Sequence, residues 1–148
     1  MRVFISHGYT DEPLAKKVAT GLEKGGLQVW DAMREISPAE NWDDKVKQAL
    51  QESDAMVVLL TANALRSSWV RREIEYALGE QSYRQRVIPV LADDPEELHR
   101  HDIPWILKRF QMINMGDYSE EDEGINQIVK ALLDKDSSNS SPKPTSIP

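Results

Sequence analysis

Short, unbroken apolar runs alternate with amphipathic segments along the chain. Each of the first four runs is continuous rather than alternating, which is typical of strands buried on both faces of a parallel sheet, and a fifth run is weaker. The runs span residues 2–6, 27–30, 55–60, 87–91 and 111–114. The pattern therefore predicts a parallel sheet covered by helices on both sides.

Helical periodicity appears between these runs. In residues 12–24, Leu14, Val18 and Leu22 recur at four-residue spacing, and Gly25-Gly26 ends the helix. The other helices are predicted over residues 42–52, over 69–81 behind a cap at Ser68, and from Asp94 and Ser119 onward. The inner stripe of the last helix is predicted to consist of Ile125, Ile128, Val129, Leu132 and Leu133.

Two further segments affect where the predicted helices and the predicted domain begin and end. Residues 37–40 have the spacing of a capping box, and they begin either the second helix or a separate turn before it. Right-handed crossovers place helices on both faces of a five-stranded parallel sheet, so the sequence predicts an α/β, flavodoxin-like three-layer fold for residues 1–133. Residues 134–148 lack periodicity and predict a disordered tail or a linker to another domain.

Composition narrows the class of protein. The 148 residues are 40% apolar and 29% charged, which fits one domain with a hydrophobic core. The chain has no cysteine, which excludes disulfides and thiolate chemistry and favours a cytoplasmic protein. A net charge of −7 disfavours nucleic acid as a partner, and no apolar run is long enough to predict a membrane span.

Ligands of open parallel sheets bind beyond the carboxyl ends of the strands, so the loops after the first three strands are the predicted site. The glycine fingerprint of dinucleotide-binding folds and the phosphate-loop lysine are both absent, and Ile5-Ser6-His7 lacks the aspartates of a receiver domain. His99 and His101 lack a third ligand at suitable spacing. We therefore expect no metal and no bound cofactor.

The third helix contains one anomalous residue. With Trp69 at zero and about 100° per residue, Glu73 projects into the apolar stripe beside Val70 and Ala77, whereas Glu75 projects toward solvent. An ionisable group on a core-facing stripe costs free energy unless it is paired. Glu73 is therefore either bonded to a nearby loop donor or part of a functional site.

Several segments, in order, resemble TIR (Toll/interleukin receptor) domains over residues 2–133. Phe4-Ile5-Ser6-His7 resembles the first-strand signature, and residues 53–61 and 87–90 resemble the third and fourth strands. Residues 68–74 resemble the start of the helix with the Trp-x-x-x-Glu motif. Asp31, Ile36-Ser37-Pro38 and Trp42 resemble the second strand and the BB loop.

The resemblance implies an NAD+ nucleosidase whose catalytic carboxylate is Glu73. It implies that Trp69 borders the ribose or nicotinamide and that Arg34 and Trp42 belong to a loop over the site. The predicted cleft floor consists of His7, Tyr9 and Asp31. NAD+ is then substrate rather than cofactor, and side-by-side TIR assembly is expected, with a role in prokaryotic antiphage defence or virulence.

Two departures and two alternatives accompany the resemblance. Pro38-Ala39 stands where the family commonly has Pro-Gly, and His7 replaces the usual aromatic residue. The first alternative is a non-catalytic adaptor or scaffold that joins other TIR domains. The second is a nucleoside deoxyribosyltransferase, whose fold and carboxylate chemistry are related.

Overall fold

The computed structural model describes residues 1–31, 42–79, 87–99, 103 and 105–138. Five parallel strands form one sheet in the order β2-β1-β3-β4-β5. The strands are β1 (Arg2–Ser6), β2 (Gln28–Asp31), β3 (Ala55–Leu60), β4 (Val87–Leu91) and β5 (Ile113–Asn114). This order is that of the flavodoxin-like winding and confirms the predicted fold class.

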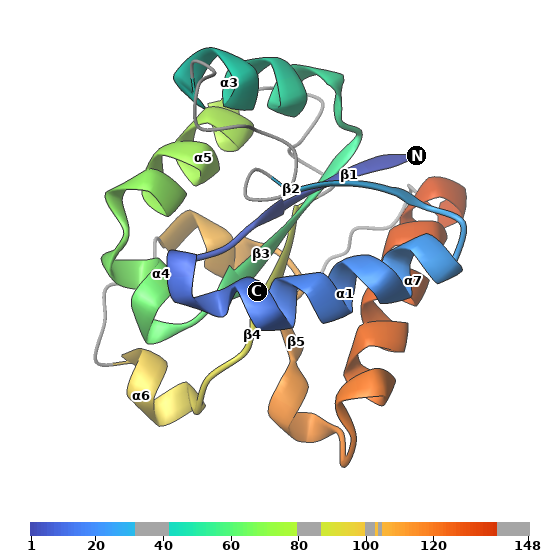
Figure 1. The fold of residues 1–148 in the computed structure, drawn as a ribbon. Coiled ribbons are helices and arrows are strands. Elements are labelled where there is room, and N and C mark those ends of the chain that lie inside the picture. The colour runs from blue at the N-terminus through green and yellow to red at the C-terminus, as the bar shows by residue number, and fades with distance from the viewer. Residues whose placement is uncertain (32–41, 80–86, 100–102, 104, 139–148) are drawn as a thin grey trace.

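Helices cover both faces of the sheet (Figure 1). One face carries α1 (Glu12–Lys24) and α7 (Glu121–Ser138), and the other carries α3 (Trp42–Glu52), α4 (Ala62–Arg66) and α5 (Ser68–Gly79). Shorter elements are α6 (Pro95–His99) and the 3-10 turns η1 (Tyr9–Asp11), η3 (Trp105–Arg109) and η4 (Met115–Asp117). The helices at residues 12–24 and 42–52 confirm their predicted bounds, whereas α4 and the 3-10 turns were not predicted.

The two apolar layers follow from side-chain alternation along β1. Val3 and Ile5 pack toward α1 and α7, and Phe4 packs toward α3 and α5. Phe4 also stacks on Trp30 of β2, with ring centroids 5.1 Å apart. Every residue of β3 is buried, because this strand lies between β1 and β4 and has helices on both sides.

The helix ends differ from prediction in two places. The hydroxyl of Ser67 accepts from the Val70 amide at 3.2 Å, so Ser67 caps α5 and the predicted cap at Ser68 is wrong by one residue. The last helix begins at Glu121 and not at the predicted Ser119. At its start, the Glu123 carboxylate accepts hydrogen bonds from the Ser119 hydroxyl at 3.1 Å and the Glu120 amide at 3.3 Å.

The last helix also differs from prediction in its stripe and its length. Ile125, Ile128 and Leu132 are buried as predicted, but Leu133 is 45% exposed. The helix continues to Ser138, five residues beyond the predicted end of the domain, and residues 139–148 lie outside the described part. None of the described helices is both long and apolar enough to cross a membrane.

Candidate active site at the carboxyl edge of the sheet

The end of β1 sends successive polar side chains to opposite faces of the sheet. Ser6 follows Phe4 toward α5, where its hydroxyl meets Glu73, and His7 follows Ile5 toward α1, where its ring meets Glu12. All five strands are parallel, so their carboxyl ends share one edge. Two polar clusters therefore lie back to back at this edge, one under α5 and one beside α1.

The α5 cluster is centred on Glu73. Its side chain lies on the inner stripe of the helix with Val70, Ile74 and Ala77, and the residue is only 3% exposed. The Ser6 hydroxyl donates a hydrogen bond to Glu73 Oε1 at 2.6 Å. Glu75, two residues later, is exposed. The helical projection made from the sequence is thus confirmed for both glutamates.

Burial changes the acidity of Glu73. The loss of water around the carboxyl raises its pKa from 4.5 to about 8, because the charged form has lost its solvation. Hydrogen bonds from Ser6 and Trp69 and the charge of His7 act in the opposite direction, whereas the charge of Asp31 adds to the rise. Near neutral pH this carboxyl is therefore a poised acid or base rather than a fully ionised surface group.

The second cluster is an ion-pair group around His7. Its Nε2 lies 3.0 Å from Asp31 Oδ1 and 3.3 Å from Glu12 Oε1, and its Nδ1 lies 2.7 Å from the Gly8 carbonyl oxygen. The side chains of His7 and Asp31 are 3% and 1% exposed. Asp31 reaches this position because it pairs in register with Ile5, so both residues face α1.

The surroundings of His7 favour its charged form. Burial by itself lowers the pKa of the imidazole, but the hydrogen bonds to Asp31 and Gly8 and the nearby Glu12 carboxylate outweigh it and hold the pKa above its usual value of 6.5. Ligand-type atoms of His7, Glu12 and Asp31 lie within 4.8 Å of one another, a spacing that metal sites also show. The 3.0 Å distance between His7 Nε2 and Asp31 Oδ1 also suits a hydrogen bond.

Trp69 connects Glu73 to the outer surface of α5. Its side chain hydrogen-bonds to the Glu73 carboxyl, and the Arg72 guanidinium lies 5.5 Å from the centroid of its ring. The indole N–H is a donor only, so it stabilises the ionised carboxylate. Trp69 is half-buried, so its side chain both contacts Glu73 and remains partly open to solvent beside it.

The structure brings together four of the seven predicted site residues: Glu73, His7, Asp31 and Trp69. Tyr9 is 78% exposed in η1 and belongs to neither buried cluster, so its place at the cleft floor stays a prediction. Arg34 and the side chain of Trp42 lie outside the described residues.

Two residues of the site were not singled out in the sequence. Ser6 ends the first predicted strand and no site role is predicted for it, although its alternation with Phe4 points its side chain toward the helix that carries Glu73. Glu12 begins α1 and has the position of an ordinary acidic residue in a first helical turn. Only the pairing of Glu12 with His7 reveals its place in the cluster.

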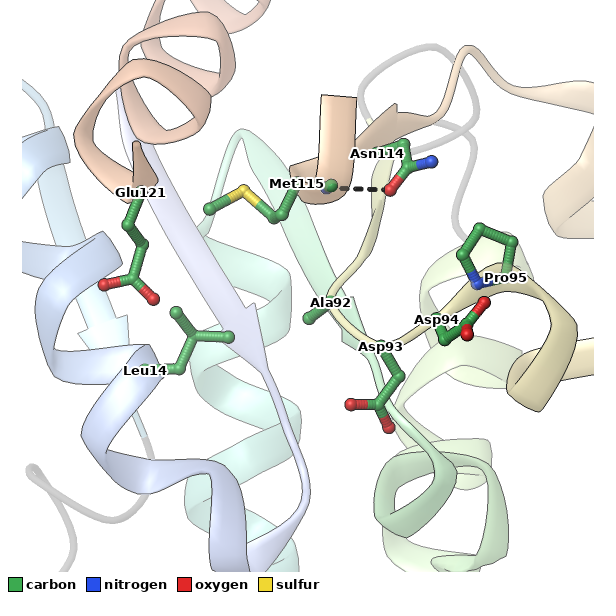
Figure 2. A pocket seen from close by; sticks show the side chains of 9 residues that line it. Leu14, Ala92, Asp93, Asp94, Pro95, Asn114, Met115 and Glu121 are labelled. Carbon is green, nitrogen blue, oxygen red and sulfur yellow. Dashed lines mark hydrogen bonds between the residues drawn. The ribbon is translucent and has the colours of Figure 1, made fainter. Parts of the chain in front are cut away.

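Two pockets lined by described residues lie away from Glu73. Figure 2 shows the first, of about 440 Å³, between the ends of β4 and β5, the start of α7 and Leu14 of α1. Its polar lining includes Asp93, Asp94 and Glu121. The second, of about 400 Å³, lies between α1 and α7. Neither pocket is lined by Glu73, so the site is identified by its buried chemistry and not by a cavity among the described residues.

Comparisons with known proteins agree with this architecture. The family model of the TIR domain matches residues 3–129. The NAD(+) hydrolase TirS of Staphylococcus aureus is 26% identical over 132 residues, covering 86% of this chain and 47% of TirS. A proposed cyclic ADP-D-ribose synthase, TIR2 of Cytobacillus dafuensis, is 29% identical over 82 residues, covering 51% of this chain and 22% of the relative. This chain thus spans less than half the length of either relative.

A solved structure gives the same picture of the fold. The TIR domain of the Toll-related receptor TRR-2 from Hydra magnipapillata superposes with a TM-score of 0.68 at 15% identity, covering 90% of this chain and 95% of that domain. At this identity the similarity concerns the fold alone. The sheet order, the buried glutamate of α5 and the family match over residues 3–129 together lead to one conclusion: this chain belongs to the TIR domain family.

Proposed function

We propose that this TIR domain cleaves the bond between nicotinamide and ribose in NAD+, with Glu73 as the catalytic carboxylate. The observation that carries the proposal is the buried carboxyl of Glu73, held by Ser6 at the carboxyl edge of the sheet. The other residues of this stripe of α5, Val70, Ile74 and Ala77, are apolar, so a buried carboxyl among them costs stability. Its cost in stability is explained if the group acts on a substrate.

The chemistry needs one negative charge. Nicotinamide is a cation in NAD+ and leaves as a neutral base when the C1′–N bond breaks, because the bonding electron pair goes to the ring nitrogen. No general acid is therefore required, in contrast to ordinary glycosidases. Positive charge develops on the ribose ring, and the ionised Glu73 stabilises it in a site with little water. A water molecule then bonds to C1′ and loses a proton, which gives ADP-ribose.

The surrounding charges suit the cationic nicotinamide ring of the substrate. Asp31 and Glu12 provide two carboxylates against the single charge of His7, and ionised Glu73 adds a third. A nicotinamide cation beside Glu73 lowers the pKa of the Glu73 carboxyl, which burial raises, and so favours the ionised carboxylate. By family resemblance we also assign substrate contacts to Trp69, Trp42 and Arg34.

One comparison of variants tests the proposal. Purified protein at high concentration is mixed with NAD+, and free nicotinamide is measured for the native chain, Glu73→Gln and Glu75→Gln. Glu75 lies two residues from Glu73 on the same helix but is exposed, so it is the matched control. We expect at least a hundredfold loss of nicotinamide release in Glu73→Gln and native rates in Glu75→Gln. Equal rates in all three proteins would remove Glu73 from the mechanism.

The product depends on the group that attacks C1′. Water gives ADP-ribose, whereas attack by an adenine nitrogen of the same molecule gives a cyclic isomer. The relatives are named as a hydrolase and as a proposed cyclic ADP-ribose synthase, so we propose that both products be measured. Chromatography of the reaction mixture separates them.

Assembly with other TIR domains is the second proposed function. Glu73 is 3% exposed in the described single chain, and neither described pocket reaches it. We propose that side-by-side association of TIR domains completes the substrate cleft, so that the specific activity rises with protein concentration. Sedimentation velocity and activity measured over the same range of concentrations test this. Full activity in a sample that stays monomeric contradicts it.

We further propose a role in prokaryotic antiphage defence, in which cleavage lowers cellular NAD+ during infection. Phage plating on cells that produce the native chain is compared with plating on cells that produce Glu73→Gln. Protection that survives the substitution points to the assembly function instead of cleavage.

A further inference from the structure

Two carboxylates converge on one ring nitrogen of His7. Asp31 Oδ1 lies 3.0 Å and Glu12 Oε1 lies 3.3 Å from Nε2, and ligand-type atoms of all three residues lie within 4.8 Å of one another. Atoms bound to one ion at about 2.1 Å are themselves about 3.0–3.4 Å apart, when their angles lie between those of an octahedron and a tetrahedron. The two distances from Nε2 therefore match the separations of neighbouring ligands around a small cation.

The other ring nitrogen of His7 has the contact that a metal-binding histidine needs. Nδ1 lies 2.7 Å from the Gly8 carbonyl oxygen, which can only accept a hydrogen bond, so Nδ1 carries a proton. In the neutral ring the lone pair is then on Nε2, which faces Asp31 and Glu12. Histidine ligands of metals commonly donate their second N–H to a backbone carbonyl, because this contact fixes the tautomer and orients the ring. The ring of His7 is thus oriented to bind a cation through Nε2.

The charges of this cluster suit a divalent cation better than a proton. The side chains of His7 and Asp31 are 3% and 1% exposed, and that of Glu12 is 21% exposed. With a proton on Nε2, two carboxylates surround one positive charge, so a net negative charge stays in a largely buried place and costs free energy. A divalent cation on the neutral ring balances both carboxylates. Glu12 Oε1 is itself sealed from solvent, and no described residue donates a hydrogen bond to it.

We propose that His7, Asp31 and Glu12 form a binding site for a divalent transition metal, with Zn²⁺ as the expected ion. One imidazole and two carboxylates suit Zn²⁺, whereas Ca²⁺ takes about six to eight oxygen ligands. The partly exposed side chain of Glu12 provides the route of entry. Glu73 lies on the other face of β1, under α5, so the metal site is separate from the proposed catalytic carboxylate.

The proposed site joins three segments of the chain. His7 follows β1, Asp31 ends β2 and Glu12 begins α1. A metal bound there ties the carboxyl ends of two neighbouring strands to the start of a helix, so its binding free energy adds to the stability of the folded chain. The expectation of no metal came from His99 and His101, which lack a third ligand in the sequence. The cluster has no such sequence motif, because the parallel register of β1 and β2 brings its members together.

Metal binding by the purified chain tests the proposal. His99→Gln and His101→Gln are introduced together, so that His7 is the one remaining histidine and Zn²⁺ cannot bind the His-x-His pair. Isothermal titration calorimetry with ZnCl₂ at pH 7.5 is expected to show one site per chain, with weaker binding of Mn²⁺ and the weakest of Ca²⁺. Glu12→Gln is expected to weaken Zn²⁺ binding at least tenfold. Glu75→Gln removes an equal charge from an exposed position on α5, so it is the control and binds as its parent does.

Two further readouts locate the ion. In protein labelled with ¹⁵N-histidine, Zn²⁺ is expected to shift the Nε2 signal of His7 and to leave the Nδ1 proton in place. At a hundredfold excess over Kd, Zn²⁺ is expected to raise the melting temperature by at least about 5 °C, and to have no such effect on Asp31→Asn. Should Asp31→Asn fail to fold, Glu12→Gln takes its place in the melting experiment, because the Glu12 side chain is partly exposed.

Three outcomes overturn the proposal. The first is the absence of saturable Zn²⁺ binding, and the second is binding that both Glu12→Gln and Asp31→Asn leave unchanged. The third is a proton that stays on His7 Nε2 at saturating Zn²⁺, which makes the cluster a buried ion pair only. None of these measurements uses nicotinamide release, so a failure of the proposed NAD+ cleavage and a failure of the metal site are distinguished.

Discussion

The Ser6 hydroxyl donates a 2.6 Å hydrogen bond to Glu73 Oε1 and so joins two residues 67 positions apart in the chain. Both groups are buried, so the bond is not weakened by competing water. It fixes the direction of the one carboxyl on the inner face of α5. The chemical character of this site therefore depends on a contact between the first strand and a helix in the middle of the sequence.

The pH dependence of NAD+ cleavage follows from the acidity of Glu73. Because burial raises its pKa to about 8 and the active form is ionised, kcat/KM is expected to rise with pH and to level off above about pH 8. At pH 6 we expect about 1% of the plateau value, from the fraction ionised. The midpoint of the kcat profile is expected at a lower pH than that of kcat/KM, because the bound nicotinamide cation favours ionisation of Glu73. Initial rates of nicotinamide release between pH 5.5 and 9.5 measure both profiles, and a flat kcat/KM profile contradicts the assignment.

Removal of the Ser6 hydroxyl is expected to make Glu73 harder to ionise. A hydrogen bond to a charged group contributes about 1.5–3 kcal/mol, so Ser6→Ala is expected to shift the kcat/KM profile by about one pH unit to higher pH. The rate at pH 7 then falls about tenfold. Ser68→Ala, which changes an exposed serine at the start of α5, is the control. The same profile in both variants would show that the Ser6 bond has no effect on acidity.

The indole N–H of Trp69 is expected to act in the same direction as Ser6. Trp69→Phe retains an aromatic ring but removes the donor to Glu73, so we expect a shift of the profile to higher pH and a several-fold lower rate at pH 7. Arg72→Gln is the comparison, because it removes the cation 5.5 Å from the ring centroid and leaves the N–H in place. We expect the Arg72 variant to keep the native pH midpoint.

The burial of Glu73 is expected to reduce stability at alkaline pH. Its pKa is raised in the folded chain, so the folded state holds a proton that the unfolded state has lost between about pH 4.5 and pH 8. The free energy of unfolding therefore falls as the pH rises through this range, by up to about 5 kcal/mol. Glu73→Gln lacks this loss. Chemical denaturation of both proteins at pH 5 and pH 9 measures the difference, and we expect the variant to gain relative stability at pH 9.

The contact between α1 and α7 requires a glycine on α1. A Cβ atom added at Gly21 would lie 2.3 Å from Ile125 Cγ2. Alanine favours a helix over glycine by about 1 kcal/mol, but Ile125 is β-branched and cannot easily move, so we expect Gly21→Ala to lower the free energy of unfolding by about 1–3 kcal/mol. Urea denaturation measures this. The same substitution in an Ile125→Ala background is expected to cost less, and an equal cost in both backgrounds excludes the clash.

Much of the fold could be predicted because local patterns carry it. The continuous apolar runs predicted the buried strands, and the bounds of β1, β3 and β4 agree with the structure. The periodicity of residues 69–78 placed Glu73 on the inner face and Glu75 in solvent, which the burial of both residues confirms. Such predictions need only the angle between successive residues of one element.

The polar contacts of the site could not be predicted in this way. Tyr9 lies in a loop where site residues are expected, yet its side chain in η1 is exposed to solvent. Glu12 has the position of an ordinary acidic residue in a first helical turn, yet it pairs with His7. The sequence by itself determined the strands, the main helices and the inward position of Glu73, because these depend on periodicity within single elements. Only the tertiary structure decided that Ser6 meets Glu73 while His7 meets Asp31, because parallel register and the alternation of β1 bring together side chains from three distant segments.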